Sequence, residues 1–170
     1  MENKPNYFSK SATKALFVIA FGSLMFYFYK QFPSLNSKND LIQVKGILKD
    51  FSFKENNIGR THEYLYYFHL SDLNASFRIE DESVSVFKLN SFYSKVKTGD
   101  EISLYVLKSD SSKLNLKGDL YVFGVHGNKI EFLDIEDAIA ETKTAKLFLM
   151  YLALLSFVGG FIAYIYFILR

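Results

Sequence analysis

Two stretches of the chain, residues 15–29 and 147–169, contain no charged residue and are apolar on every side of a helix. An α-helix rises about 1.5 Å per residue, so the second stretch is long enough to cross a hydrocarbon core of about 30 Å. The first would span about 22 Å, and it reaches the required length if the amines of Lys14 and Lys30 extend to the membrane surface. We therefore predict two transmembrane helices, over 15–32 and 147–169.

Two other interpretations of the first stretch are weaker. A cleaved signal peptide needs small residues directly after its apolar region, whereas this region ends in the aromatic run Phe26–Tyr29. A buried helix of a soluble protein would show a polar face, and 170 residues cannot surround a helix that is apolar on all sides. The aromatic run instead suits the headgroup region of a bilayer.

Two crossings would place both termini on one side of the membrane and the residues between them on the other. The tail over 1–14 carries three lysines, and positive charge next to a span favours the cytoplasmic side. A long intervening domain can be translocated whatever its own charge. We expect cytoplasmic termini, with the domain outside a bacterial inner or plasma membrane.

Between the expected spans, a linker over 33–40 precedes a segment, 41–134, in which apolar and polar residues alternate with the period of β-strands. Apolar residues three to four apart predict a short helix within 83–96. Gly127 and Asn128 predict a two-residue hairpin turn of type II′. Strands are expected at 41–48, 63–70, 75–79, 101–108, 119–126 and 129–134.

Short strands with a single helix after the third suggest a small curved sheet or a partly open barrel of the oligonucleotide/oligosaccharide-binding (OB) type. Residues 135–146 contain good helix formers and no Gly or Pro, which predicts a helical stalk that continues into 147–169. The expected fold class is a membrane α + β protein. Two transmembrane helices flank a small, mainly antiparallel β-domain with one short helix.

The residue types that carry most chemistry are scarce. The chain has no Cys, which excludes thiol nucleophiles, disulfides and Cys-ligated zinc. His62 and His69 lie on opposite faces of one expected strand, and His126 is far from both in the sequence, so metal-ligand spacing is missing. Short motifs of nucleotide binding, serine hydrolysis and zinc proteolysis do not occur. We predict no catalytic residue, no metal, no cofactor and no enzyme activity.

The charge balance argues against a nucleic-acid partner. The whole chain has a net charge of +2, but residues 31–146 contain 15 basic and 17 acidic residues and therefore carry −2. Nucleic-acid phosphates bind to positively charged surfaces. We interpret the aromatic residues of the second expected strand as core and, where exposed, as the first candidate patch for a protein partner: Tyr64, Tyr66, Tyr67 and Phe68.

Small residues recur at a spacing of four in the second apolar stretch, where Ser156 precedes Gly160 and Gly159 precedes Ala163. Small residues on one side of a membrane helix allow the backbone of another helix to approach closely. The partner that we expect first is the chain's own first apolar stretch, around Gly22. Self-association and packing on another membrane protein are the alternatives.

Three short segments, Val44–Gly46, Ser76–Ile79 and Val96–Val106, resemble uncharacterised bacterial two-span membrane proteins that carry a small β-domain between their helices. The order of the expected elements resembles theirs too, and the resemblance implies architecture but no activity. We therefore expect a protein of the lipid bilayer that acts by contact with another membrane or envelope protein, as a complex subunit or accessory factor. An immunity protein that binds a toxin and a membrane-tethered enzyme are the alternatives.

Overall fold

The computed structural model describes residues 7–31, 35–58 and 61–168. The chain divides into a barrel unit, Ser34–Lys143, and a helical unit made of Met1–Pro33 and Thr144–Arg170. Short 3₁₀ helices lie between some of the main elements. In chain order the main elements are α1 (Tyr7–Gln31), β1 (Leu41–Ile58), β2 (Thr61–Leu70), β3 (Ser76–Ile79), α2 (Leu89–Lys95), β4 (Glu101–Leu107), β5 (Asp119–Gly127), β6 (Ile130–Leu133) and α3 (Ile135–Ile168).

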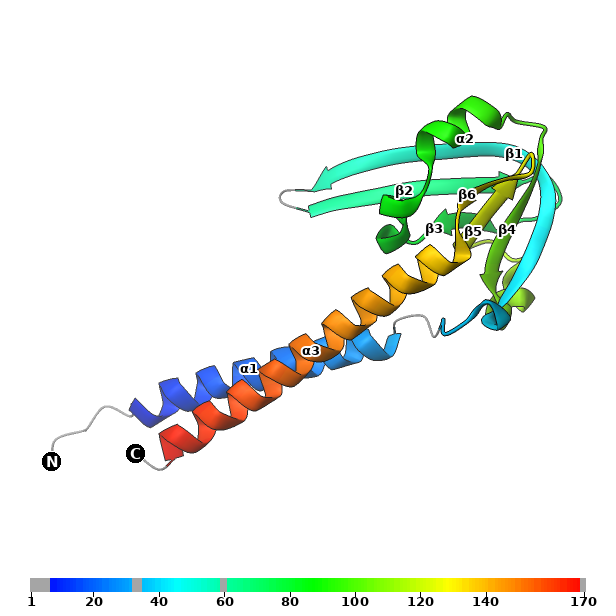
Figure 1. The fold of residues 1–170 in the computed structure, drawn as a ribbon. Helices are drawn as coiled ribbons and strands as arrows, with labels where there is room; N and C mark the ends of the chain where they lie inside the picture. Colours follow the sequence, from blue (N-terminus) through cyan, green and yellow to red (C-terminus); the bar gives the residue numbers. More distant parts are fainter. Residues whose placement is uncertain (1–6, 32–34, 59–60, 169–170) are drawn as a thin grey trace, which may run out of the picture. The chain divides into compact units, whose positions relative to one another are not determined.

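Strands β1 to β5 close into a barrel (Figure 1). The sheet order is β3-β2-β1-β4-β5-β6, in which neighbouring strands are antiparallel, and β3 also pairs in parallel with β5. This parallel pair aligns Ser76–Ile79 with Asp119–Val122. A five-stranded barrel with a helix between its third and fourth strands is the arrangement of the OB fold.

The predicted β-domain is confirmed, and its barrel is consistent with the predicted OB-like type. The predicted curved sheet or partly open barrel is wrong, because the parallel pairing of β3 with β5 closes it. Alternation of apolar and polar residues indicates where strands lie but does not say which strands pair. Strands β3 and β5 are far apart in the chain, so no local sequence pattern predicts that they pair.

The first strand is much longer than the expected 41–48, because β1 continues for 18 residues to Ile58. Its first part, Leu41–Ile47, pairs with β4, and the rest pairs with β2. A register shift between Leu48 and Asp50 marks the change of partner, as in a β-bulge that bends its strand. One strand thereby contributes to both sides of the barrel.

The barrel core contains a cluster of aromatic rings. Phe92 of α2 lies 5.4 Å from Phe68 of β2 and 5.1 Å from Phe132 of β6, measured between ring centroids. Aromatic pairs at this separation add to the stability that their buried area provides. The helix expected within 83–96 is present as a 3₁₀ helix, Asp81–Val86, followed by α2, and it covers the core with this phenylalanine.

Strands β5 and β6 form the expected hairpin but use a different turn. Its central residues are Asn128 and Lys129, with φ angles of 53° and 63°, and positive φ at both positions defines type I′ rather than type II′. Gly127 instead pairs with Ile130. The Asn128 side-chain amide donates a hydrogen bond of 2.7 Å to the Lys95 carbonyl and fixes the turn.

Helix α3 is continuous over 34 residues, as the lack of Gly and Pro near its start predicted. It begins after Asp134, whose Oδ1 accepts a hydrogen bond of 2.7 Å from the Glu136 amide and caps the helix. The first turns of α3 bury Ile135, Ala138 and Ile139 in the barrel core. From Thr144 onwards the helix belongs to the helical unit.

Among the described residues, α3 is also the one helix that is long and apolar enough to cross a membrane, over Ile135–Tyr166. The apolar part of α1 is shorter, contains Ser23 and two tyrosines, and ends at Lys14 and Lys30. The predicted pair of flanking transmembrane helices is therefore wrong. The predicted orientation assumed two membrane crossings, so it is no longer supported. Most side chains of the N-terminal tail, 1–14, lie outside the described residues, as does Arg170.

The segment expected to be a loose linker is ordered where the structure describes it. Leu35 is buried, and Asp40 Oδ2 accepts hydrogen bonds from the backbone amides of Asn36 and Ser37 at 2.8 and 3.0 Å. Both bonds stabilise the ionised carboxylate and lower the pKa of Asp40. Residues 33 and 34 of the expected linker lie outside the described residues.

Candidate functional site

The outer face of the barrel brings polar and aromatic side chains of three strands into one row. Tyr67 of β2 is paired with Arg78 of β3, and Arg78 is paired with Tyr121 of β5. Directly paired residues point to the same side of a sheet, so these three side chains lie on one face. We call the face of β2, β3 and β5 that contains them the tyrosine–arginine face.

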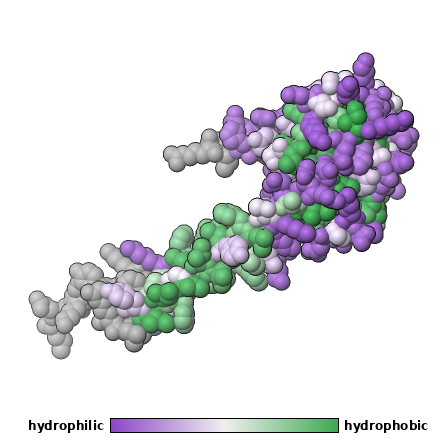
Figure 2. Space-filling model, in the orientation of Figure 1, coloured by the Kyte–Doolittle hydropathy of each residue, from purple (hydrophilic) through white to green (hydrophobic). Residues whose placement is uncertain are grey.

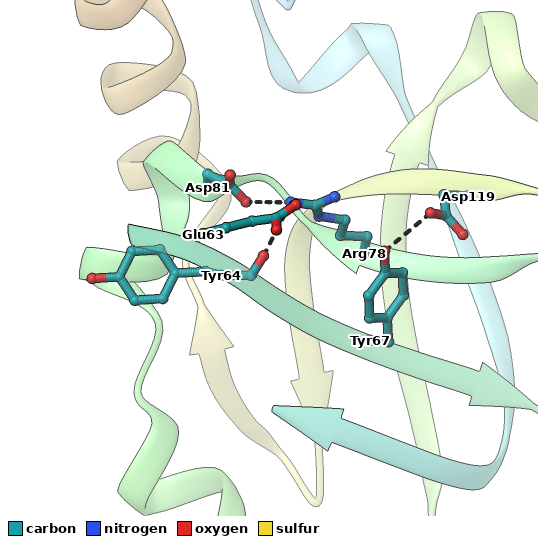
Figure 3. A network of polar contacts seen from close by, with 6 residues as sticks. All are labelled: Glu63, Tyr64, Tyr67, Arg78, Asp81 and Asp119. Carbon is teal, nitrogen blue, oxygen red and sulfur yellow. Dashed lines mark hydrogen bonds and ion pairs between the residues drawn. The ribbon is translucent and has the colours of Figure 1, made fainter. Parts of the chain in front are cut away.

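Arg78 is the centre of this face (Figure 3). Its guanidinium donates hydrogen bonds to Asp81 Oδ1 at 2.8 Å and to the Tyr64 carbonyl at 3.1 Å, and it lies 3.8 Å from Glu63 Oε1. Burial opposes the charge, but the hydrogen bond and charge of Asp81 outweigh it and raise the pKa of Arg78. The side chain is therefore a fixed cation.

The aromatic partner of Arg78 is Tyr67. The guanidinium carbon of Arg78 lies 5.8 Å from the centroid of the Tyr67 ring, within the range of a cation–π contact. At its other end, the Tyr67 hydroxyl donates a hydrogen bond of 3.1 Å to Asp119 Oδ2 (Figure 3). Burial and this bond to a carboxylate raise the pKa of Tyr67, so the hydroxyl keeps its proton.

The charge of the tyrosine–arginine face is negative. Three carboxylates, those of Glu63, Asp81 and Asp119, accompany the single guanidinium of Arg78. An anionic ligand such as a phosphate would meet this excess of negative charge, whereas a basic or neutral polar group would not. The face therefore holds aromatic and acceptor groups in fixed positions.

The structure separates the four residues of the predicted aromatic patch. Tyr66 and Phe68 are buried in the core, and the Tyr66 hydroxyl donates to Glu55 Oε1 at 3.2 Å. Tyr64 is half-buried beside Tyr66, with 5.9 Å between ring centroids. Only Tyr67 has its side chain on the tyrosine–arginine face. Its neighbours there are Arg78 and Tyr121. Tyr121 was missed because the pairing of β3 with β5 joins segments that are far apart in the chain.

The predicted helix-packing residues fall into two groups. A Cβ atom added to Gly22 of α1 would lie 3.0 Å from the Ser156 Cβ of α3, and one added to Gly160 would lie 2.8 Å from Ile19 Cγ1. These two contacts run in opposite directions along the helices, so α1 and α3 pack antiparallel. A Cβ at Gly159 would have no neighbour within 4 Å among the described atoms, and Ala163 is half-buried.

The three histidines have separate surroundings. His69 Nδ1 lies 2.5 Å from Asp50 Oδ1, and His126 Nε2 lies 2.7 Å from Glu131 Oε1. His62 is exposed near the end of the β1–β2 hairpin. Within the described part of the chain, no three His, Asp or Glu side chains form a group that could hold a metal ion.

The chain was compared with family models, with curated proteins and with solved structures, and none of them matches it. The interpretation of its function therefore depends on the geometry described above.

Proposed function

We propose that this chain is a membrane-anchored binding protein, in which the part of α3 from Thr144 onwards lies in the lipid bilayer and the barrel binds a protein partner. The proposal has two parts, the anchor and the binding surface. The exposure of α3 is the observation that supports the proposal as a whole, because a long exposed apolar helix is more stable in lipid than in water.

The anchor is supported by the surface of α3. Only 17% of its most apolar window is buried, whereas the core helix of a soluble protein would be mostly buried. Large side chains such as Phe148, Leu155 and Phe161 are exposed along it. On the face that Figure 2 shows, hydrophobic residues dominate the described part of the helical unit and hydrophilic residues dominate the barrel unit. A continuous apolar surface of this length matches hydrocarbon better than water.

The binding surface is supported by the tyrosine–arginine face. Strands β2 and β3 supply the surface that OB barrels commonly use for ligands, although a shared fold does not by itself carry a function. On this chain the surface has an excess of carboxylates, so the partner that fits is a protein segment with basic side chains. Tyr121 is 43% exposed and is the aromatic residue that such a segment would contact.

Site-specific photo-crosslinking in native membranes tests the binding surface. A benzophenone amino acid at Tyr121 should capture one protein, and Asp119→Lys should abolish the adduct by reversing a charge that attracts the basic partner. Ile47 is the matched control, because it is 41% exposed on the outer surface of β1 and pairs with Glu101 of β4, away from β3. The proposal fails if both positions capture the same proteins, or if charge reversal leaves the Tyr121 adduct unchanged.

The identity of the captured protein separates the two kinds of partner considered above. An envelope protein would indicate a complex subunit or accessory factor, and a toxin would indicate an immunity protein. A covalent dimer of this chain would instead indicate self-association.

A further inference from the structure

A carboxyl group is buried where the barrel meets the start of α3. Glu80 follows β3 and is 5% exposed, and Thr142 of α3 is 1% exposed. Glu80 is the one acidic or basic residue classed as buried in the described part of the chain. Both residues belong to the barrel unit, and neither contributes to the tyrosine–arginine face.

The hydrogen bonds at Thr142 depend on whether Glu80 carries a proton. Thr142 Oγ1 lies 2.9 Å from Glu80 Oε2 and 2.8 Å from the Ala138 carbonyl oxygen. A hydroxyl group has a single proton to donate. If Glu80 is ionised, both neighbours are acceptors, and Thr142 can satisfy only one of them. If Glu80 is protonated, it donates to Thr142 and Thr142 donates to Ala138, so that both contacts are hydrogen bonds.

The charges around Glu80 also favour its neutral form. Asp81 and Glu82 follow it directly, and their negative charges raise its pKa. The nearby cation, Arg78, is engaged by Asp81 at 2.8 Å and faces Glu63 of β2. From α3 the contact is the uncharged Thr142.

Burial is the largest cause of the shift, and together with these charges it raises the pKa of Glu80 to about 7, against the lowering effect of the Thr142 hydrogen bond. The pKa of this carboxyl therefore lies in the physiological range, well above the ordinary value for Glu.

We infer that Glu80 and Thr142 form a proton-dependent latch, which holds the first turns of α3 on the barrel when Glu80 is protonated and loosens them when Glu80 is ionised. Ionisation leaves a buried carboxylate that competes with Ala138 for the only proton of Thr142. The latch connects the barrel with the helix that we propose as its anchor, but it does not depend on that proposal, since all its atoms lie in the barrel unit.

The sign of the pH effect follows from linkage. Because the folded-state pKa is raised, the folded protein binds one proton more than the unfolded chain between the ordinary Glu value of 4.5 and about 7. Stability from this group is fully present below pH 4.5, is lost as the pH rises through this window, and stays low above it. Each pH unit inside the window changes the unfolding equilibrium constant by up to about tenfold.

The test compares the full chain in detergent with Glu80→Gln, which keeps the shape but cannot titrate. Between about pH 5 and pH 7 the wild-type unfolding constant should rise about fortyfold more than that of Glu80→Gln. Glu101→Gln is the matched control, because Glu101 is exposed on β4, and it should retain the wild-type pH dependence. Equal pH dependence of wild type and Glu80→Gln would overturn the inference.

Two measurements on the wild-type chain keep the inference testable even if Glu80→Gln does not fold. Infrared spectroscopy should show the carbonyl band of a protonated carboxylic acid at about pH 6 that disappears above about pH 8. Hydrogen exchange, corrected for the intrinsic effect of pH, should show lower protection of amides 138–143 at the higher pH and unchanged protection of Phe68 in β2. The absence of the band, or equal protection of 138–143 at both pH values, would disprove the latch.

Discussion

Gly124 of β5 shows how one residue decides where a helix can begin. A Cβ atom at this position would lie 2.6 Å from Ile135 Cγ1 at the start of α3 and 3.0 Å from Tyr105 Cδ2 of β4. Real Cβ atoms do not approach other heavy atoms so closely, and a packed interior does not yield without cost. The missing side chain therefore lets α3 start directly against the barrel.

Replacement of Gly124 by Ala should destabilise the barrel by about 1–3 kcal/mol through overpacking. The free energy of unfolding from denaturant titration measures this loss. Ile135→Ala in the same chain removes the atom that the new methyl group meets, so the double variant should be less destabilised than the sum of the two single variants. Simple additivity of the two changes would show that the contact between 124 and 135 is not the cause.

The important single residues were only partly visible in the sequence. Alternation along 75–79 indicates that Arg78 lies on the polar face of a strand, but it does not show that Arg78 lies beside Tyr67 and Tyr121. Glu80 looks like the first member of a solvated acidic run, Glu80–Glu82, but it is buried and in contact with Thr142 of α3. Contacts between distant segments decide both roles.

At the scale of elements, α1 and α3 are an antiparallel pair joined by close backbone contacts at small residues. Gly22 approaches Ser156, and Gly160 approaches Ile19. The spacing of small residues predicts close packing on α1 around Gly22, but it does not distinguish Gly160 from Gly159, since consecutive helical residues differ by about 100° in direction. Which of the two glycines faces α1 depends on how α3 is rotated about its own axis, and the packing of α3 against α1 sets this rotation.

Two neighbouring glycines in α3 make a matched pair for testing this contact. Gly160→Leu should weaken the packing of α1 on α3 by about 1–3 kcal/mol, because its side chain would enter the space of Ile19. Gly159→Leu should leave the packing unchanged and slightly favour the helix, since Leu is a better helix former than Gly. Thermal unfolding followed by circular dichroism in detergent compares the two variants. Equal loss in both would mean that α1 and α3 do not pack through Gly160.

At the scale of the whole molecule, the sequence correctly divides the chain into apolar helices and a β-domain. It wrongly predicts that α1, like α3, is long and apolar enough to cross a membrane. Length and absence of charge are direct signals for α3, and the barrel strands follow from alternation. Alternation does not predict that the barrel is closed, because β3 and β5 become neighbours only through the tertiary fold. A short apolar stretch such as 15–29 is consistent with several roles, and composition alone does not choose among them.

The membrane anchor can be tested by placing charge on the exposed side of α3. Lysine at both Leu155 and Val158 should raise the free energy of insertion by about 5–7 kcal/mol, at about 2.5–3.5 kcal/mol for each lysine near the centre of a span. The double variant should move from the membrane pellet to the supernatant after alkaline carbonate extraction. Alanine at the same two positions should stay in the pellet. A wild-type chain that is itself extracted would contradict the anchor.

The parallel pair of β3 and β5 also sets an order of events during synthesis. Its two segments are about forty positions apart, and such non-local pairing makes a β-rich domain fold slowly. The barrel cannot close until Val122 has been made, yet Val122 precedes the first residue of α3. All five barrel strands therefore leave the ribosome before α3 does, and they can complete their hydrogen bonds before the helix that we propose as the anchor has emerged.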